Sequence, residues 1–181
     1  ETTLTQDAER AASELGRKLA GKYLTFRLGD EEYGLEILKV QEIIQMQRVT
    51  RVPRSPSFVR GVINLRGKVI PVVELREKFG LGHEEDTDKT CIIVVQIEHD
   101  TAPVTMGIII DEVREVLDID AKAIEAAPSF GEDVNTDFIM GIGKVDTSVK
   151  MLLDIDRVLD PEEKRGVGEI GDATAGEGAE T

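Results

Sequence analysis

Hydrophobic and polar residues alternate along much of the chain, as they do in strands that bury one face. Leu24, Phe26 and Leu28 fall on one face of a first strand, and Gly29-Asp30 supplies a turn before the alternation resumes. Further short strands are expected at 33–37, 40–44, 48–52, 62–65, 69–75, 91–97, 104–110, 113–119, 138–145 and 150–155. Many short strands with tight turns and only fragments of helix predict small antiparallel barrels.

This pattern occurs twice. Residues 34–43 (GLEILKVQEI) return 73 residues later as 107–116 (GIIIDEVREV), with the Gly, Val, Glu and apolar positions in register. A second match follows each copy, because 58–62 corresponds to 138–142. A period this long is not a solenoid repeat. It predicts a mainly β fold made of two copies of one unit of about five strands, with a seam between them where a partner can bind.

Both ends of the chain differ from the middle. Alanines and leucines fall at helical spacing within residues 1–21, which fits a short amphipathic helix and a frayed arm equally well. A short helix is expected to begin at Asp160-Pro161, and the glycine-rich remainder of 161–181 to form a disordered tail with almost nothing to bury. The folded part is then 22–160. Its first barrel covers about 22–80 and its second about 90–160, with a charged linker between them.

Charge, cysteine content and the length of apolar runs restrict the possible partners and the cellular location. The chain carries 22 basic and 36 acidic residues, a net charge of −14. Such a surface repels phosphate backbones and anionic lipid, so nucleic acid is not an expected partner. The single cysteine, Cys91, fits a reducing compartment, and no apolar run approaches the roughly 20 residues of a membrane helix. We therefore expect a cytoplasmic protein without direct membrane insertion.

The sequence shows no pattern typical of catalysis. His83, His99 and Cys91 lie far apart, without the close spacing that builds a tetrahedral metal site. No Gly-x-Ser-x-Gly nucleophile motif occurs, and Cys91 is flanked by isoleucines, as a small buried thiol would be. We expect no catalytic residue, no metal ligand and no cofactor. An enzyme is the weakest of the function classes, and a binding module is the strongest.

Two features are candidates for binding. The repeated segments 40–43 and 113–116 contain aliphatic residues that are more often core, but the two copies can also line one groove that suits an amphipathic helix. Arg66 lies at a hairpin turn and departs from the repeat. An arginine at a turn usually only aids solubility, whereas a planar guanidinium beside Glu42 would pair with its carboxylate.

These segments also carry a family resemblance. Residues 23–34 (YLTFRLGDEEYG), 37–43 (ILKVQEI) and 58–67 (FVRGVINLRG) resemble the CheW family of bacterial chemotaxis coupling proteins, as do 69–76 and 107–113. The match covers roughly residues 22 to 160. The resemblance implies two SH3-like five-stranded β-barrel subdomains related by pseudo-symmetry, with short helices.

The resemblance also implies a non-enzymatic adaptor. It would couple the cytoplasmic tip of methyl-accepting chemotaxis receptors to the regulatory domain of the histidine kinase CheA, at receptor clusters on the inner face of the membrane. The receptor-binding residues implied are Ile37, Val40, Glu42, Ile43, Val113 and Val116. The kinase-binding residues implied are Gly61, Leu65, Arg66 and Gly141, and Arg66 has the alternative role of holding Glu42 in place.

A general peptide-binding barrel unrelated to chemotaxis stays open beside this hypothesis. It would explain the barrels and an apolar groove. It would not explain the match of the three motifs.

Overall fold

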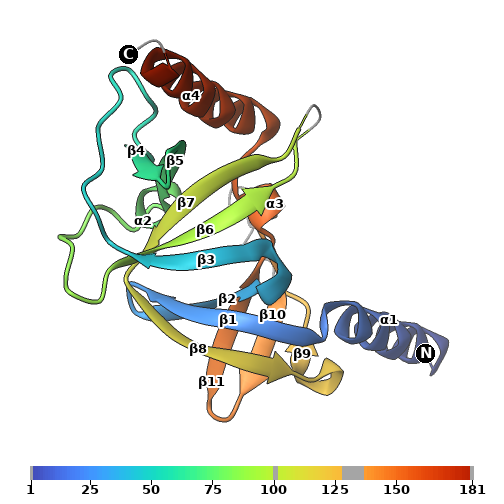
Figure 1. Ribbon diagram of the computed structural model, residues 1–181. Coiled ribbons are helices and arrows are strands. Elements are labelled where there is room, and N and C mark those ends of the chain that lie inside the picture. The colour runs from blue at the N-terminus through green and yellow to red at the C-terminus, as the bar shows by residue number, and fades with distance from the viewer. Residues whose placement is uncertain (1, 100–101, 128–136, 180–181) are drawn as a thin grey trace.

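Two β-sheets form the body of the protein, and a helix extends from each end of the chain (Figure 1). The computed structural model describes residues 2–99, 102–127 and 137–179. The strands are β1 (Gly21–Leu28), β2 (Glu31–Glu36), β3 (Val40–Gln45), β4 (Val59–Leu65), β5 (Lys68–Glu74), β6 (Cys91–Ile97), β7 (Val104–Ile110), β8 (Glu112–Ile119), β9 (Ile124–Glu125), β10 (Ile139–Val145) and β11 (Ser148–Leu153). The helices are α1 (Thr2–Leu19), η1 (Ile37–Lys39), α2 (Leu75–Lys78), η2 (Ala121–Ala123), α3 (Ile155–Val158) and α4 (Pro161–Ala179).

Each sheet combines strands from both halves of the sequence. Sheet A has the order β8-β1-β2-β11-β10-β9, and sheet B has the order β3-β6-β7-β5-β4. The hairpin β1–β2 is flanked by β8 and by the parallel strand β11, just as the hairpin β6–β7 is flanked by β3 and by the parallel strand β5. The duplication expected from the sequence is therefore present as two sheets with matching connectivity.

The mainly β, pseudo-symmetric fold is confirmed, but the halves are interleaved. The expected barrels at 22–80 and 90–160 do not each form a sheet of their own, and neither strand order closes into a complete ring. Alternation reveals where a strand lies and which face it buries. It does not reveal which strand will pair with the free edge of a hairpin, because backbone donors and acceptors are the same in every strand.

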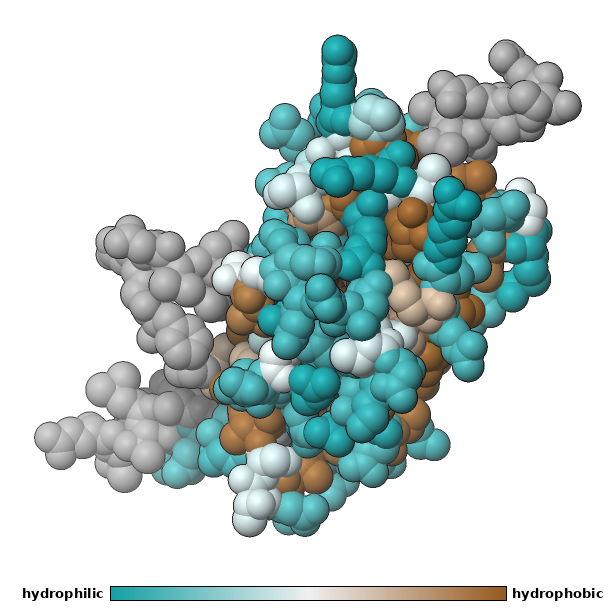
Figure 2. Space-filling model, turned by 90° about the vertical axis from the view of Figure 1, so that its left-hand side faces the viewer, coloured by the Kyte–Doolittle hydropathy of each residue, from teal (hydrophilic) through white to brown (hydrophobic). Residues whose placement is uncertain are grey.

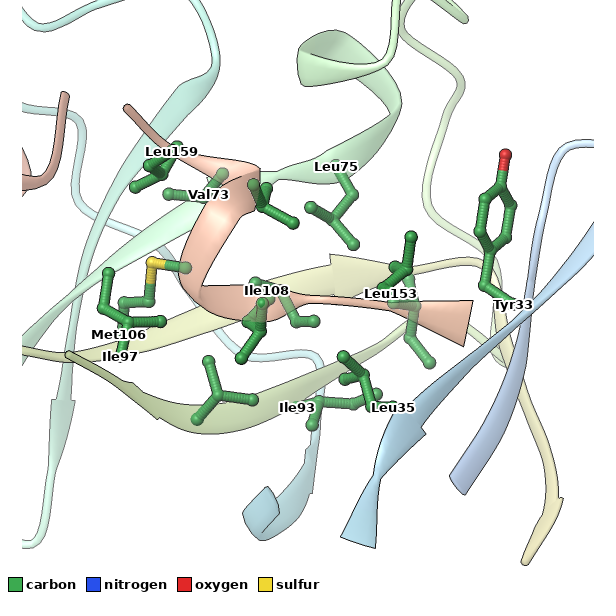
Figure 3. Close-up of a cluster of buried hydrophobic side chains, with 14 of the residues drawn as sticks. Tyr33, Leu35, Val73, Leu75, Ile93, Ile97, Met106, Ile108, Leu153 and Leu159 are labelled. Carbon is green, nitrogen blue, oxygen red and sulfur yellow. The ribbon is translucent and has the colours of Figure 1, made fainter. Parts of the chain in front are cut away.

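One large apolar layer lies between the sheets and belongs to both. Leu35 of β2, Ile93 of β6 and Leu153 of β11 point toward one another in this layer (Figure 3) and are at most 1% exposed. We call it the shared core. Its buried members are Leu24, Phe26, Leu28, Tyr33, Leu35, Val59, Val73, Leu75, Ile93, Val95, Ile97, Met106, Ile108, Ile110, Leu153, Ile155, Val158, Leu159 and Val167.

Each sheet also buries residues on its other face. On sheet B, Ile63, Ile70, Val72, Ile92, Val94 and Ile109 form a second cluster, the B cluster. On sheet A, Leu19, Tyr23, Ile119, Ile124 and Leu152 form a third, the A cluster. A strand with apolar residues on both faces reads as a continuous apolar run, which is the pattern of 91–97.

Both terminal segments are helical, and α1 docks on the A cluster whereas α4 docks on the shared core. At the N-terminus, α1 buries Leu19 in the A cluster with Leu15 packed beside it. At the C-terminus, α4 runs to Ala179, so the expected short helix and disordered tail differ from the structure, and residues 180–181 lie outside the described part. Val167 is fully buried in the shared core and Ile170 packs against it, although the glycine-rich composition suggested almost nothing to bury.

Gly61 and Gly141 occupy equivalent places in the two halves and show why the repeat keeps a glycine. Each follows a register shift in its hairpin, β4–β5 or β10–β11. A Cβ on Gly61 would collide with the backbone carbonyl of Thr50, and one on Gly141 would lie 3.0 Å from the carbonyl oxygen of Glu125. A crossing backbone segment therefore covers each glycine, and it excludes a side chain at Gly61 and leaves only a tight fit at Gly141.

We expect Gly61→Ala to destabilise the protein by about 3 kcal/mol, because φ at Gly61 is +152° and the crossing backbone cannot move aside. The control is Gly166→Ala in α4, where a Cβ meets nothing within 4 Å. That change should stabilise slightly, by up to about 1 kcal/mol, because alanine favours a helix. Chemical unfolding of both variants measures the difference. Equal midpoints would contradict the close approach at Gly61.

Candidate functional site: two edge strips and a charged turn

The two repeated segments singled out in the sequence lie on the outer strands of the two sheets. β3 is one of the two end strands of sheet B, and β8 is one of the two end strands of sheet A. We call residues 40–43 of β3 and 113–116 of β8 the edge strips. Each strip borders a strand whose side chains fill the shared core, β6 for the first and β1 for the second. The strips are therefore equivalent borders of one apolar layer.

Strand register fixes which way the apolar strip residues point. Ile43 pairs with Ile93, and Val116 pairs with Leu24; both partners are shared-core residues. Directly opposed residues project from the same face of a sheet. Ile43 and Val116 therefore extend the shared-core face of each sheet to its border.

Exposure separates packing residues from surface residues within the strips. Val40 and Val113 are partly buried and pack against the shared core, as does Ile37 of η1. Ile43 is 45% exposed and Val116 is 53% exposed. The sequence could not distinguish core from binding surface among these aliphatic residues. The structure places Ile43 and Val116 at the surface.

Glu42 belongs to the opposite face of β3. It pairs with Val94, a member of the B cluster, so its side chain projects away from the face that carries Ile43. There the guanidinium of Arg66 donates two hydrogen bonds to it, from Nη1 to Oε2 at 3.1 Å and from Nη2 to Oε1. The predicted Glu42–Arg66 pair is confirmed, and it is bidentate.

The ion pair shifts the pKa values of both partners. The hydrogen bond from Arg66 lowers the pKa of the Glu42 carboxyl below its ordinary value, and the same bond raises the pKa of Arg66. The Arg66 side chain is nonetheless 72% exposed, so salt screens the attraction and its contribution to stability is small.

Arg66 reaches Glu42 because of the turn that carries it. Arg66 and Gly67 have φ values of +53° and +84°, as a two-residue hairpin loop requires for both central residues. The side-chain oxygen of Asn64 accepts a hydrogen bond from the Gly67 amide at 2.8 Å. In the other half, the equivalent position of the β10–β11 turn holds Asp146, with φ +54°.

The residues implied as kinase-binding do not form one patch. Leu65 and Arg66 lie together at the β4–β5 turn, and Leu65 packs against the B cluster. Gly61 and Gly141 are both buried, one in each sheet, beneath crossing backbone. The two glycines therefore shape the surface above them and expose no side chain of their own.

A basic stretch surrounds the charged turn, and the sequence analysis overlooked it. Residues 43–73 contain six basic residues and no acidic one, although the chain as a whole has a net charge of −14. Arg48, Arg51 and Arg54 are exposed and form no ion pair with any residue that the structure describes. The segment joining β3 to β4 lies on the left of Figure 1, and Figure 2 shows that this side is largely hydrophilic. Counting charge by segment would have found this stretch.

One side-chain cluster has atoms that metals use. Ligand atoms of Glu74, Glu77 and His83 lie within 4.8 Å of one another. However, Arg60 Nη2 lies 3.2 Å from Glu74 Oε1, and His83 Nδ1 lies 3.0 Å from the same oxygen. The positive charge of the guanidinium repels a second cation at this position. The cluster is therefore better described as a polar network that holds the linker at residues 80–89 against the end of β5.

Cys91, the only cysteine of the chain, is half-buried. Burial raises the pKa of its thiol, which makes the thiol a weaker nucleophile at neutral pH. Within the described ranges, no helix has both the length and the apolar character needed to cross a membrane.

Comparison with known proteins agrees with this architecture. The profile of the CheW-like domain matches residues 22–163. A "Chemotaxis protein CheW" of Klebsiella aerogenes is 37% identical over 148 residues, which cover 82% of this chain and 87% of the relative. One of Bacillus subtilis is 35% identical over 146 residues, which cover 80% of this chain and 90% of the relative.

A solved structure gives the same result for the fold. The crystal structure of the scaffolding protein TtCheW from Thermoanaerobacter tengcongensis superimposes with a TM-score of 0.68 at 34% sequence identity. The superposition covers 78% of this chain and 89% of that one. Sequence profile, relatives and fold agree, and the resemblance carried by the three motifs is confirmed: this chain belongs to the CheW-like domain family.

Proposed function

We propose that this protein is a non-enzymatic chemotaxis adaptor that couples methyl-accepting chemoreceptors to the histidine kinase CheA. The observation that carries the proposal is the pair of edge strips, which leave Ile43 and Val116 exposed at equivalent borders of one shared core. Relatives named as chemotaxis proteins and a neighbour described as a scaffolding protein support it. In this role the protein works in the cytoplasm, at receptor clusters on the inner face of the membrane.

The receptor contact uses the edge strips. A helical hairpin at the cytoplasmic tip of a receptor presents apolar residues at i, i+3, i+4 and i+7, which can dock on exposed aliphatic side chains. Ile43 and Val116 contact it directly, and Ile37, Val40 and Val113 support them from the shared core. Glu42 acts from the opposite face of β3, through Arg66.

The kinase contact uses the region of the β4–β5 turn. Leu65 and Arg66 provide side chains there, and the covered glycines Gly61 and Gly141 set the backbone shape in the two sheets. The unpaired arginines of the neighbouring basic stretch suit an acidic surface on the regulatory domain of CheA. Guanidinium groups bind carboxylates in a planar, bidentate manner, which adds orientation to attraction.

Glu42 and Arg66 connect the two contacts. Glu42 belongs to the strand that carries the first edge strip, and Arg66 belongs to the turn assigned to the kinase. A partner that shifts β3 therefore changes the position of the turn. Coupling of this kind requires that the partner bind the two arrangements with different affinity.

The adaptor role is tested by reconstitution. Kinase and receptor are combined with and without this protein, and the rate of kinase autophosphorylation is measured. We expect receptor control of that rate only when the protein is present, because it holds the two partners together. Equal rates in the two mixtures, with or without receptor ligand, would remove the proposal.

Ile43→Ala and Val116→Ala should each weaken binding of a receptor-tip fragment by roughly five- to tenfold, because each removes apolar area from the contact. Val149→Ala is the matched control, since Val149 is also exposed, at 48%, but lies on β11. Titration calorimetry measures the affinities. A general peptide-binding barrel predicts instead that unrelated amphipathic helices bind as well as the receptor tip, which the same titration tests.

Arg66→Glu should weaken binding of the kinase regulatory domain by about tenfold, because it places two carboxylates side by side and removes the planar cation. The exchange variant Glu42→Arg/Arg66→Glu restores the ion pair in reverse. It should recover part of the affinity if Arg66 acts by positioning β3 and the turn. If the single reversal leaves affinity for both partners unchanged, Arg66 is an ordinary surface residue.

The same pair predicts a dependence on pH. Because the pKa of Glu42 is lower in the folded protein than in an unfolded chain, the ion pair contributes fully above the ordinary carboxyl pKa of about 4.3. Its contribution is lost as the pH falls through the folded pKa. The stability difference between the wild type and Arg66→Gln should therefore vanish in strong acid and be present at neutral pH.

A further inference from the structure

Leu38 is the most exposed large hydrophobic residue that the structure describes. Its side chain is 93% exposed, against 53% for Val116 and 45% for Ile43. A single exposed leucine is common on protein surfaces, so its surroundings decide whether it can serve as a contact. The sequence analysis did not single it out, because an aliphatic residue between two strands resembles core.

The segment that carries Leu38 is held firmly on both sides. Ile37 packs against the shared core, and the amide of Val40 donates to the Ile37 carbonyl at the end of η1. Lys39 Nζ lies 2.8 Å from Asp156 Oδ2 and so ties η1 to α3. Leu38 therefore projects from an anchored turn, and a partner that binds it need not order the turn first.

The other half of the molecule shows that the fold does not need a leucine here. The repeat places Asp111 at the equivalent position. The Asp111 carboxylate is only 14% exposed and accepts hydrogen bonds from the Gly29 amide and from Arg76 Nη1, both at 2.8 Å. One half thus uses the position for internal contacts, and the other presents an unpartnered apolar side chain to solvent.

The location of η1 continues the edge strips. η1 directly precedes β3 and contacts β1 of sheet A and β6 of sheet B, so it lies where the two sheets meet. Residues 36–45 and 112–120 together contain six acidic and two basic residues. Both basic residues are engaged, Lys39 with Asp156 and Arg114 with Glu32 and Glu112. Glu42 and Glu112 are paired with basic side chains as well. The four acidic residues that form no ion pair with any residue in the described ranges still favour a partner with basic flanks; they are Glu36, Glu115, Asp118 and Asp120.

We propose that Leu38 is an anchor residue of the receptor contact, which inserts into the apolar stripe of a helical partner flanked by lysine or arginine side chains. This inference rests on the proposed adaptor function. It adds a contact residue outside the two edge strips and predicts that the partner surface carries positive charge. Because the equivalent residue is Asp111, the contact is made by one half only, and the partner helix binds in a single orientation.

The test uses the full chain, a receptor-tip fragment and isothermal titration. Leu38→Ala and Leu38→Asn should weaken binding by about tenfold, as expected when one buried leucine is lost from an interface. Leu81→Ala and Leu81→Asn are the matched controls, because Leu81 is also exposed, at 43%, but lies in the linker. They should stay within about twofold of the wild type. Chemical unfolding should be unchanged in all four, since surface substitutions seldom alter stability by more than about 0.5 kcal/mol.

The outcomes separate this inference from the proposed function. If the wild type binds, Ile43→Ala weakens binding and both Leu38 variants bind like the wild type, the inference is overturned and the adaptor function stands. If the wild type does not bind the fragment at all, the inference about Leu38 and the proposed receptor contact are both wrong. Raising the salt from about 0.05 M to about 0.5 M should weaken wild-type binding, because charge pairs at an interface are screened. Binding that is insensitive to salt would overturn the basic flanks.

Discussion

Burial of one apolar layer by two sheets at once is the constraint on which this structure depends. Leu24 of β1 and Ile93 of β6 reach the same core from opposite sheets, and each sheet needs strands from both halves of the chain to complete its side of it. Neither half can bury its apolar face alone. The two copies are therefore two sequence repeats but one folding unit. The charged linker between them joins copies whose strands pair within the same two sheets.

This interleaving also places the functional surface. Because β3 and β8 each end a sheet beside a strand that fills the shared core, that core reaches the surface along both of them. An apolar border of this kind is a liability when it is exposed, since open edges invite pairing with other chains. Here an acidic residue precedes each exposed aliphatic one, Glu42 before Ile43 and Glu115 before Val116. Such a border can stay in water until a suitable helix covers it.

Much of this arrangement could be predicted from the sequence, and the exceptions have physical causes. Alternation located most of the strands, the repeat revealed the two equivalent units, and charge complementarity found the Glu42–Arg66 pair. The strand expected at 48–52 was wrong, because this segment forms only one isolated bridge, between Thr50 and Val62. Strand partners were missed, because alternation carries no information about which edge a strand joins. The length of α4 was also missed, since Val167 is buried in the shared core and Ile170 packs against it, in a glycine-rich segment whose composition alone argues for disorder. Separating Ile43 from Val40 required the exposure of each side chain, because both are aliphatic and both pair with strand residues of the shared core.

In a duplicated fold, agreement and disagreement between the copies carry different information. Gly61 and Gly141 agree because crossing backbone lies close to both, and Val40 and Val113 agree because both pack on the shared core. Such positions are fixed by packing, and packing is the same in both halves. Positions that differ are free of that constraint. The differences at the turn, Arg66 against Asp146, and before the strip, Leu38 against Asp111, are therefore where one half can acquire a contact that the other lacks. An adaptor that must bind two different partners from a nearly symmetric frame requires this kind of asymmetry, since two identical surfaces would bind the same partner twice.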